Sequence, residues 1–152
     1  MRRQKAKAAA LIGAVVALAA AVGPAAGEER AGEPHTVAVD CSGNPQVRPG
    51  SYLIACGDGN NGLVSLRWTQ WGPVSAAAGG LDMVNDCRPY CAAGRFHSYP
   101  VTVRLDTVRP RPGHQGQSYY SVLHVHYTAN TPPGTPRDTS YPIVVASRAP
   151  LA

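Results

Sequence analysis

Apolar and polar residues alternate along two segments in the second half of the chain. In residues 100–105, Val101, Val103 and Leu105 fall on one side and polar residues on the other. In residues 119–128, one side would carry Tyr119, Ser121, Leu123, Val125 and Tyr127. Because successive side chains of a β-strand point to opposite faces, both segments are predicted to be strands with one buried face.

Shorter apolar runs between turn-forming residues predict five further strands. These runs cover residues 36–39, 52–55, 63–68, 71–78 and 141–146. Pro100 and Pro142 each follow a tyrosine and are expected to open a strand, where a missing N–H is tolerated. Stretches rich in Gly, Pro, Asn and Asp predict loops at 57–62, 79–86, 109–113 and 131–136. About seven short strands predict an all-β fold, a small disulfide-stapled β-sandwich or barrel.

The N-terminal segment has the layout of a secretory signal peptide. A basic stretch at residues 2–7 precedes an unbroken apolar run at 8–22, and small residues follow at 23–27. The run is shorter than the roughly 20 residues of a spanning helix, so a retained membrane anchor is the less favoured alternative. We expect residues 1–27 to be removed by cleavage near residues 25–27. The mature form would then be secreted (extracellular), with no membrane segment.

The rest of the chain has the length of one domain. We expect a flexible lead-in at 28–35, a single β domain at 36–147 and a tail at 148–152. From residue 28 onward there are ten Arg, no Lys and nine acidic residues, which gives a net charge of +1 against +5 for the whole chain. Nucleic-acid-binding domains carry clustered positive charge, so this balance argues against a nucleic-acid partner.

Four cysteines, Cys41, Cys56, Cys87 and Cys91, form an even set. In an exported chain such a set predicts two disulfides. Three connectivities are possible. The pairing Cys41–Cys56 with Cys87–Cys91 is favoured because each bond then closes a local loop.

Several spaced motifs carry a resemblance to a known family. Residues 52–60, 68–72, 85–94 and 99–100 (YLIACGDGN, WTQWG, NDCRPYCAAG and YP) resemble small secreted proteins of uncharacterised function from high-GC, actinobacterial-type bacteria. The resemblance implies export and a single compact domain, and it implies no activity. Residues 99–103 and the later aromatic strand are more weakly similar to the C-terminal half of the subtilisin inhibitors, which are also secreted, β-rich and held by two disulfides. That family has a cysteine near its C-terminus, whereas none follows Cys91 here.

The candidate binding surface consists of Trp68, Trp71, Arg88 and Tyr90. The two tryptophans could form a platform for a sugar or a peptide, although aromatic residues on strands more often pack in the core. Arg88 and Tyr90 lie between Cys87 and Cys91, where a short disulfide loop could present Arg88 to a protease. Pro89 would follow the cleaved bond, which disfavours that kind of binding.

The candidate metal ligands are His124 and His126. They lie two residues apart and would share one face of a strand, as a pair of zinc or copper ligands can. A third ligand would have to come from His97 or His114, both in predicted loops. The alternative is a polar face exposed to solvent.

No catalytic signature stands out in the sequence. Every Glu lies at or before residue 33, so a catalytic carboxylate pair would have to be Asp. There is no G-x-S-x-G motif, and paired cysteines offer no free thiol. We therefore expect a non-enzymatic domain without a cofactor, which binds an unknown extracellular or cell-envelope protein or glycan. Inhibition of an extracellular hydrolase and binding of a metal are the alternatives.

Overall fold

The computed structural model describes residues 35–145. The predicted signal peptide at 1–27 with its cleavage region, nearly all of the lead-in and the tail at 148–152 lie outside the described residues. Within residues 35–145, no helix is long and apolar enough to cross a membrane.

Eight strands and one short 3-10 helix make up this part of the chain. They are β1 (Thr36–Val39), β2 (Pro45–Gln46), β3 (Tyr52–Leu53), β4 (Asn61–Trp71), β5 (Ala76–Asn85), η1 (Cys91–Ala93), β6 (Phe96–Pro110), β7 (Ser118–Tyr127) and β8 (Asp138–Pro142). The strand order is β2-β1-β7-β6-β5-β4-β3, and β8 also pairs with β7. All pairings are antiparallel except that of β1 with β7. The predicted all-β, disulfide-stapled fold is confirmed.

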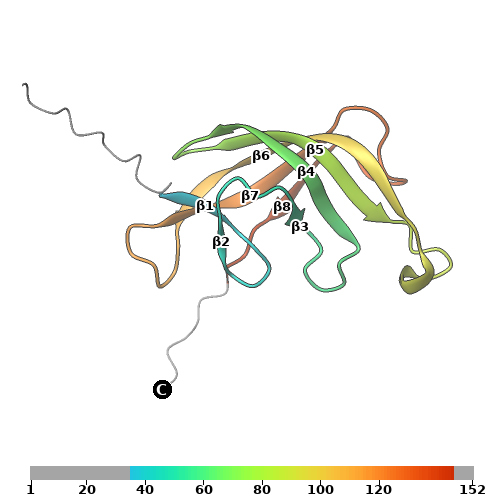
Figure 1. Cartoon of the computed structure of the whole chain (residues 1–152), viewed down its shortest axis with the longest axis horizontal. Coiled ribbons are helices and arrows are strands. Elements are labelled where there is room, and N and C mark those ends of the chain that lie inside the picture. The colour runs from blue at the N-terminus through green and yellow to red at the C-terminus, as the bar shows by residue number, and fades with distance from the viewer. Residues whose placement is uncertain (1–34, 146–152) are drawn as a thin grey trace, which may run out of the picture. The chain divides into compact units, whose positions relative to one another are not determined.

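The sheet curls, so that its two ends approach each other below the long strands β4 to β7 (Figure 1). Side chains join the two ends where the backbone ladder does not. Tyr52 Oη on β3 donates to the carbonyl of Val39 on β1 at 2.8 Å. Trp71 Nε1 on β4 donates to the carbonyl of Thr36 at 3.1 Å. The curled sheet therefore resembles a small barrel that is closed partly by side chains.

The two alternating segments supply the core that this curl encloses. On β6, Val101, Val103 and Leu105 are at most 3% exposed, as the alternation predicts. The five predicted positions of β7 are also buried, namely Tyr119, Ser121, Leu123, Val125 and Tyr127. Register explains the match, because Val103 pairs with Val125 and Leu105 with Leu123.

One predicted loop is a strand. The prediction of a strand at 71–78 and a loop at 79–86 is wrong, because β4 ends at Trp71 and β5 runs from Ala76 to Asn85. Gly80 belongs in the strand because the backbones come close there. A Cβ at Gly80 would lie 2.9 Å from the carbonyl oxygen of Val64, beside the irregularity in the β4–β5 register. Glycine inside a strand is typical of such an approach.

Two other boundaries also differ from the sequence predictions. Pro100 lies inside β6 rather than at its start, and Thr128 N–H donates to the Pro100 carbonyl at 3.0 Å. The ring nitrogen of Pro100 faces the same side, just where β7 ends, so its missing N–H interrupts no ladder. The last strand covers Asp138–Pro142 instead of 141–146, and Pro142 closes that strand.

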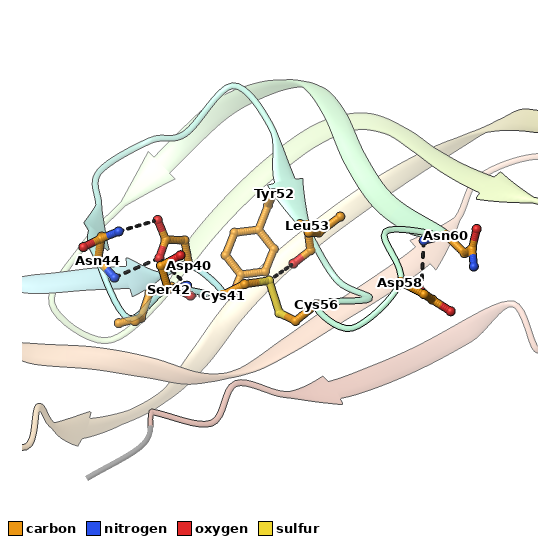
Figure 2. The surroundings of a disulfide bond; sticks show 10 residues. Asp40, Cys41, Ser42, Asn44, Tyr52, Leu53, Cys56, Asp58 and Asn60 are labelled. Carbon is orange, nitrogen blue, oxygen red and sulfur yellow. Dashed lines mark hydrogen bonds between the residues drawn. A yellow bond between two sulfur atoms is a disulfide. The ribbon is translucent and has the colours of Figure 1, made fainter. Parts of the chain in front are cut away.

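Both disulfides have the favoured pairing. Cys41–Cys56 joins the loop after β1 to the loop after β3, with the two Cα atoms 5.4 Å apart (Figure 2). Beside this bond, the Asp40 carboxylate accepts hydrogen bonds from the backbone N–H groups of Ser42 and Asn44. The Cys41–Cys56 disulfide therefore holds a turn that the Asp40 side chain also orders. The second bond, Cys87–Cys91, closes a five-residue loop between β5 and β6.

A carboxyl group lies in the core. Asp82 on β5 has no exposed surface, and its oxygens accept hydrogen bonds from Tyr127 Oη at 2.6 Å and Asn61 Nδ2 at 3.0 Å. Burial raises the pKa of Asp82, although these two hydrogen bonds act in the opposite direction. The native fold therefore favours the protonated carboxyl more than the unfolded chain does, and ionisation at neutral pH reduces stability.

The variant Asp82→Asn is expected to gain stability relative to the wild type as the pH rises. The wild type loses free energy of unfolding from the usual pKa of 3.8 upward, through the raised value of the folded state, and the amide does not titrate. The amide could also donate to Asn61 Oδ1, which has no partner among the described residues. Urea unfolding at about pH 3 and about pH 7 measures the difference. An equal difference at both pH values would contradict this prediction.

Candidate functional site

The tryptophans of the candidate surface are packing residues. Trp68 and Trp71 are partly buried against the core and meet edge to face, with ring centroids 4.6 Å apart. Trp68 Nε1 donates to the carbonyl of Pro49 at 2.8 Å, and the indole N–H of Trp71 is bonded to β1 as described above. Both indole N–H groups are thus engaged in joining segments of the fold, which favours a packing role for the two rings over an open platform. A binding role for Trp68 and Trp71 stays a prediction that no contact here supports.

The other two candidates, Arg88 and Tyr90, are presented to solvent by the loop between β5 and β6. We call residues 86–96 the staple loop, since Cys87–Cys91 lies within it. Arg88 is exposed, and Tyr90 is 64% exposed. Two more exposed side chains follow, those of Arg95 and Phe96. The loop thus presents two arginines and two aromatic rings.

A single carboxylate organises the base of the staple loop. Asp86 Oδ1 accepts hydrogen bonds from the backbone N–H groups of Arg88 at 3.1 Å and Arg95 at 2.9 Å. Its Oδ2 lies 3.0 Å from His97 Nε2. The bond from the Arg95 N–H, followed by those from His97 and the Arg88 N–H, lowers the pKa of Asp86 to about 2. Asp86 therefore stays ionised at neutral pH, and its carboxylate is engaged in hydrogen bonds at the base of the loop.

An asparagine side chain fastens the loop to the sheet. Asn85 Nδ2 donates to Asn60 Oδ1 at 2.9 Å and to the Cys91 carbonyl at 2.8 Å, while Asn85 Oδ1 accepts from the Cys87 N–H at 3.0 Å. Gly94 packs directly on this amide, because a Cβ there would lie 2.1 Å from Asn85 Oδ1. The backbone of the loop is therefore fixed at several points.

The loop adjoins an apolar hollow of about 250 Å³. Phe96 lines the hollow at the end of the staple loop, and Leu53, Val64 and Met83 line it from β3, β4 and β5. Phe96 is 50% exposed and Leu53 is 43% exposed. Apolar surface thus continues from the loop onto the sheet.

In the described part of the chain, the candidate metal ligands His124 and His126 have no third potential ligand grouped with them. His124 and His126 share the outer face of β7, as predicted, but each is engaged with neighbouring side chains. His124 contacts Ser140 and Asp106, and His126 Nδ1 lies 2.6 Å from Asp138 Oδ1. His97 lies on β6 rather than in the predicted loop, and its ring contacts Asp86 of the staple loop. In residues 35–145, no three His, Cys, Asp or Glu side chains are grouped as metal ligands. Metal binding stays a prediction that no contact here supports.

The same histidines border a shallow groove of about 520 Å³ on the outer face of the sheet. Its lining includes Ala77 and Gly79 of β5, and the space stays open because one has only a methyl group and the other has no side chain. His124 and Ser140 line the part of the groove over β7 and β8. Sequence reasoning missed this grouping, because Asp106, His124 and Ser140 are far apart in the chain. Alternation places Asp106 and His124 on the polar faces of their strands, but Ser140 lay outside every predicted strand.

Comparison with models of protein families, with characterised proteins and with solved structures finds no match to this chain. The resemblance to small secreted bacterial proteins therefore stays a prediction, and the function rests on the chain's own residues.

Proposed function

We propose that this chain is a secreted domain that binds an extracellular or cell-envelope protein through the staple loop. Two disulfides are typical of exported proteins, and the N-terminal segment has the layout of a signal peptide. The observation that carries the proposal is the loop itself. Its backbone is held by a disulfide and by the Asn85 and Asp86 side chains, while Arg88 and Tyr90 extend into solvent.

Fixed backbone and exposed side chains of these types favour protein binding. Arg and Tyr are enriched among the residues that contribute most to protein–protein affinity. A loop that is already ordered loses less conformational entropy on binding than a flexible one. Arg88 and Arg95 carry positive charge, whereas the charge of Asp86 is engaged internally. The matching partner is a protein surface that is acidic beside an apolar patch. A glycan is less favoured, because the tryptophans are packed into the fold.

The test is capture of partners from the producing cells' culture medium and envelope fractions. Immobilised wild-type protein is compared with the double variant Arg88→Ala/Tyr90→Ala, and the captured protein is then purified for direct titration. We expect the double variant to bind about 30-fold or more weakly, since loss of an interface hot spot costs about 2 kcal/mol or more. Both side chains are exposed, so the variant should keep the stability of the wild type.

A matched control replaces Val144, which is 81% exposed and lies outside the staple loop, with alanine. Asp86→Asn should also weaken binding, because it loosens the loop without removing an exposed contact. The proposal fails if every captured protein binds wild type and the Arg88→Ala/Tyr90→Ala variant equally.

Inhibition of an extracellular protease is a second candidate, favoured by the exposure of Arg88 in a disulfide-closed loop. Titration of a panel of secreted trypsin-like and subtilisin-like proteases tests it. Sub-micromolar inhibition that Arg88→Ala abolishes would favour this candidate over the general binding role. A flat response across the panel would remove it.

A further inference from the structure

Three strands bring a serine, a histidine and an aspartate together on the outer face of the sheet. The β7–β8 ladder sets the first contact. Its backbone bonds join Ile143 N–H to the Ser121 carbonyl and Tyr127 N–H to the Arg137 carbonyl. Because bonded and non-bonded pairs alternate in an antiparallel ladder, His124 and Ser140 form a non-bonded pair, in which the side chains lie closest. His124 Nδ1 and Ser140 Oγ are 2.8 Å apart.

The second contact is diagonal. Asp106 on β6 pairs with Val122, two residues before His124, and its Oδ1 lies 3.0 Å from His124 Nε2. A carboxylate only accepts hydrogen bonds, so the neutral imidazole carries its proton on Nε2. Nδ1 is then the unprotonated nitrogen, and it accepts the hydrogen bond from the Ser140 hydroxyl. The aspartate thus selects the tautomer in which His124 can act as a base toward Ser140.

Two neighbours keep Asp106 ionised and in place. Thr107 Oγ1 donates to Asp106 Oδ1 at 2.9 Å, and Arg104 Nη2 lies 3.3 Å from Asp106 Oδ2. Burial alone would raise the pKa of Asp106. The hydrogen bonds from His124 and Thr107 and the charge of Arg104 act in the opposite direction, and the pKa of Asp106 lies below its usual value. The order nucleophile, base and orienting acid is that of a serine hydrolase.

We propose that Ser140, His124 and Asp106 form a hydrolytic centre that cleaves small esters held in the groove on the outer face of the sheet. The groove reaches the Ser140–His124 pair and is floored by the small residues Ala77 and Gly79.

The reaction balances with water as the only other reactant. Ser140 Oγ attacks the carbonyl carbon of the ester while its proton passes to His124 Nδ1, and negative charge forms on the carbonyl oxygen. The carbon–oxygen bond to the leaving alkoxide breaks, and the alkoxide takes the proton from Nδ1. Water then attacks the acyl-serine through the same base, which releases the acid and restores the Ser140 hydroxyl.

The test uses p-nitrophenyl acetate as the probe on the purified, oxidised protein. We expect release of p-nitrophenolate together with one acetyl group on the peptide that contains Ser140, detected by mass spectrometry after an acid quench. Ser140→Ala should abolish that acetylation. His124→Gln should slow it about 100-fold or more, the usual contribution of a general base. Asp106→Asn should slow it as well, because an amide N–H in place of Oδ1 would favour the wrong tautomer.

Matched controls lie outside the groove. Ser98→Ala and His114→Gln replace exposed residues of the same types and should leave the acetylation of Ser140 unchanged. All variants are first compared by urea unfolding, so that a folding defect is recognised. Hydrolysis by Ser140→Ala at the wild-type rate, with no acetyl group on Ser140 in the wild type, would overturn the proposal. The same assay decides whether the expectation of a non-enzymatic domain is correct.

Discussion

Replacing Leu123 with alanine is expected to lower the free energy of unfolding by about 2–5 kcal/mol, the range found for truncation of fully buried leucines. Leu123 is 1% exposed and lies at the middle of β7, opposite Leu105 on one side and Tyr141 on the other. The cavity would therefore open between three strands that cannot all shift to fill it. Because a domain of this size has only about 5–15 kcal/mol of stability, the loss would be a large share of the total.

Urea or guanidinium unfolding followed by tryptophan fluorescence measures the change, and Trp68 and Trp71 report on it from the edge of the core. Val144→Ala is the matched aliphatic control. Its side chain is 81% exposed, so its effect should stay within about 0.5 kcal/mol. Similar losses in both variants would mean that Leu123 does not lie in the core.

Replacing Cys41 and Cys56 together with alanine is expected to cost about 3 kcal/mol, because the bond closes a loop of about 15 residues in the unfolded chain. The bond also joins the segments after β1 and β3, so its loss frees the end of the sheet that the backbone ladder does not close. Chemical unfolding of oxidised wild type and the double variant measures the difference.

The other disulfide supplies the comparison. Loss of Cys87–Cys91, with four residues of sequence separation, should cost only about 2 kcal/mol on the same chain-entropy reasoning. It should instead weaken capture of the partner, because the bond lies in the staple loop. Equal stability losses from the two double variants, with no effect on capture, would contradict both the loop-length argument and the proposed role of the loop.

The sequence was most informative where one face of a strand is buried. The central parts of β6 and β7 could be predicted, because burial of one face forces alternation on the sequence. Tyr120 is the exception, since it falls on the other face of β7 and is nevertheless 0% exposed. The disulfide pairing could be favoured because local loops are the simplest to close. The single β domain proposed for residues 36–147 is consistent with one curled sheet over the described part of that range.

β5 could not be predicted, because its sequence reflects contacts rather than alternation. Gly80 is required by the nearby backbone of β4, and Asp82 is tolerated in the core only because Tyr127 and Asn61 bond to it. Neither partner is adjacent in sequence. Local propensity therefore indicated a loop where long-range contacts specify a strand.

Of the candidate sites, one could be predicted from local sequence and the other could not. Arg88 and Tyr90 could be singled out because two nearby cysteines define a short loop. The Asp106–His124–Ser140 grouping depends instead on the registers of two strand pairs. An error of three residues in the start of β8 was enough to hide it.

The length of β6 has a consequence for how the molecule would be displayed. Its 15 residues run from Phe96, at the staple loop, to Pro110, which pairs with the start of β7 beside Thr36. At about 3.3 Å per residue the strand reaches up to about 50 Å. A surface or a fusion partner joined ahead of Thr36 would therefore hold the domain by one end and project Arg88 and Tyr90 outward at the other, with the full strand acting as a spacer.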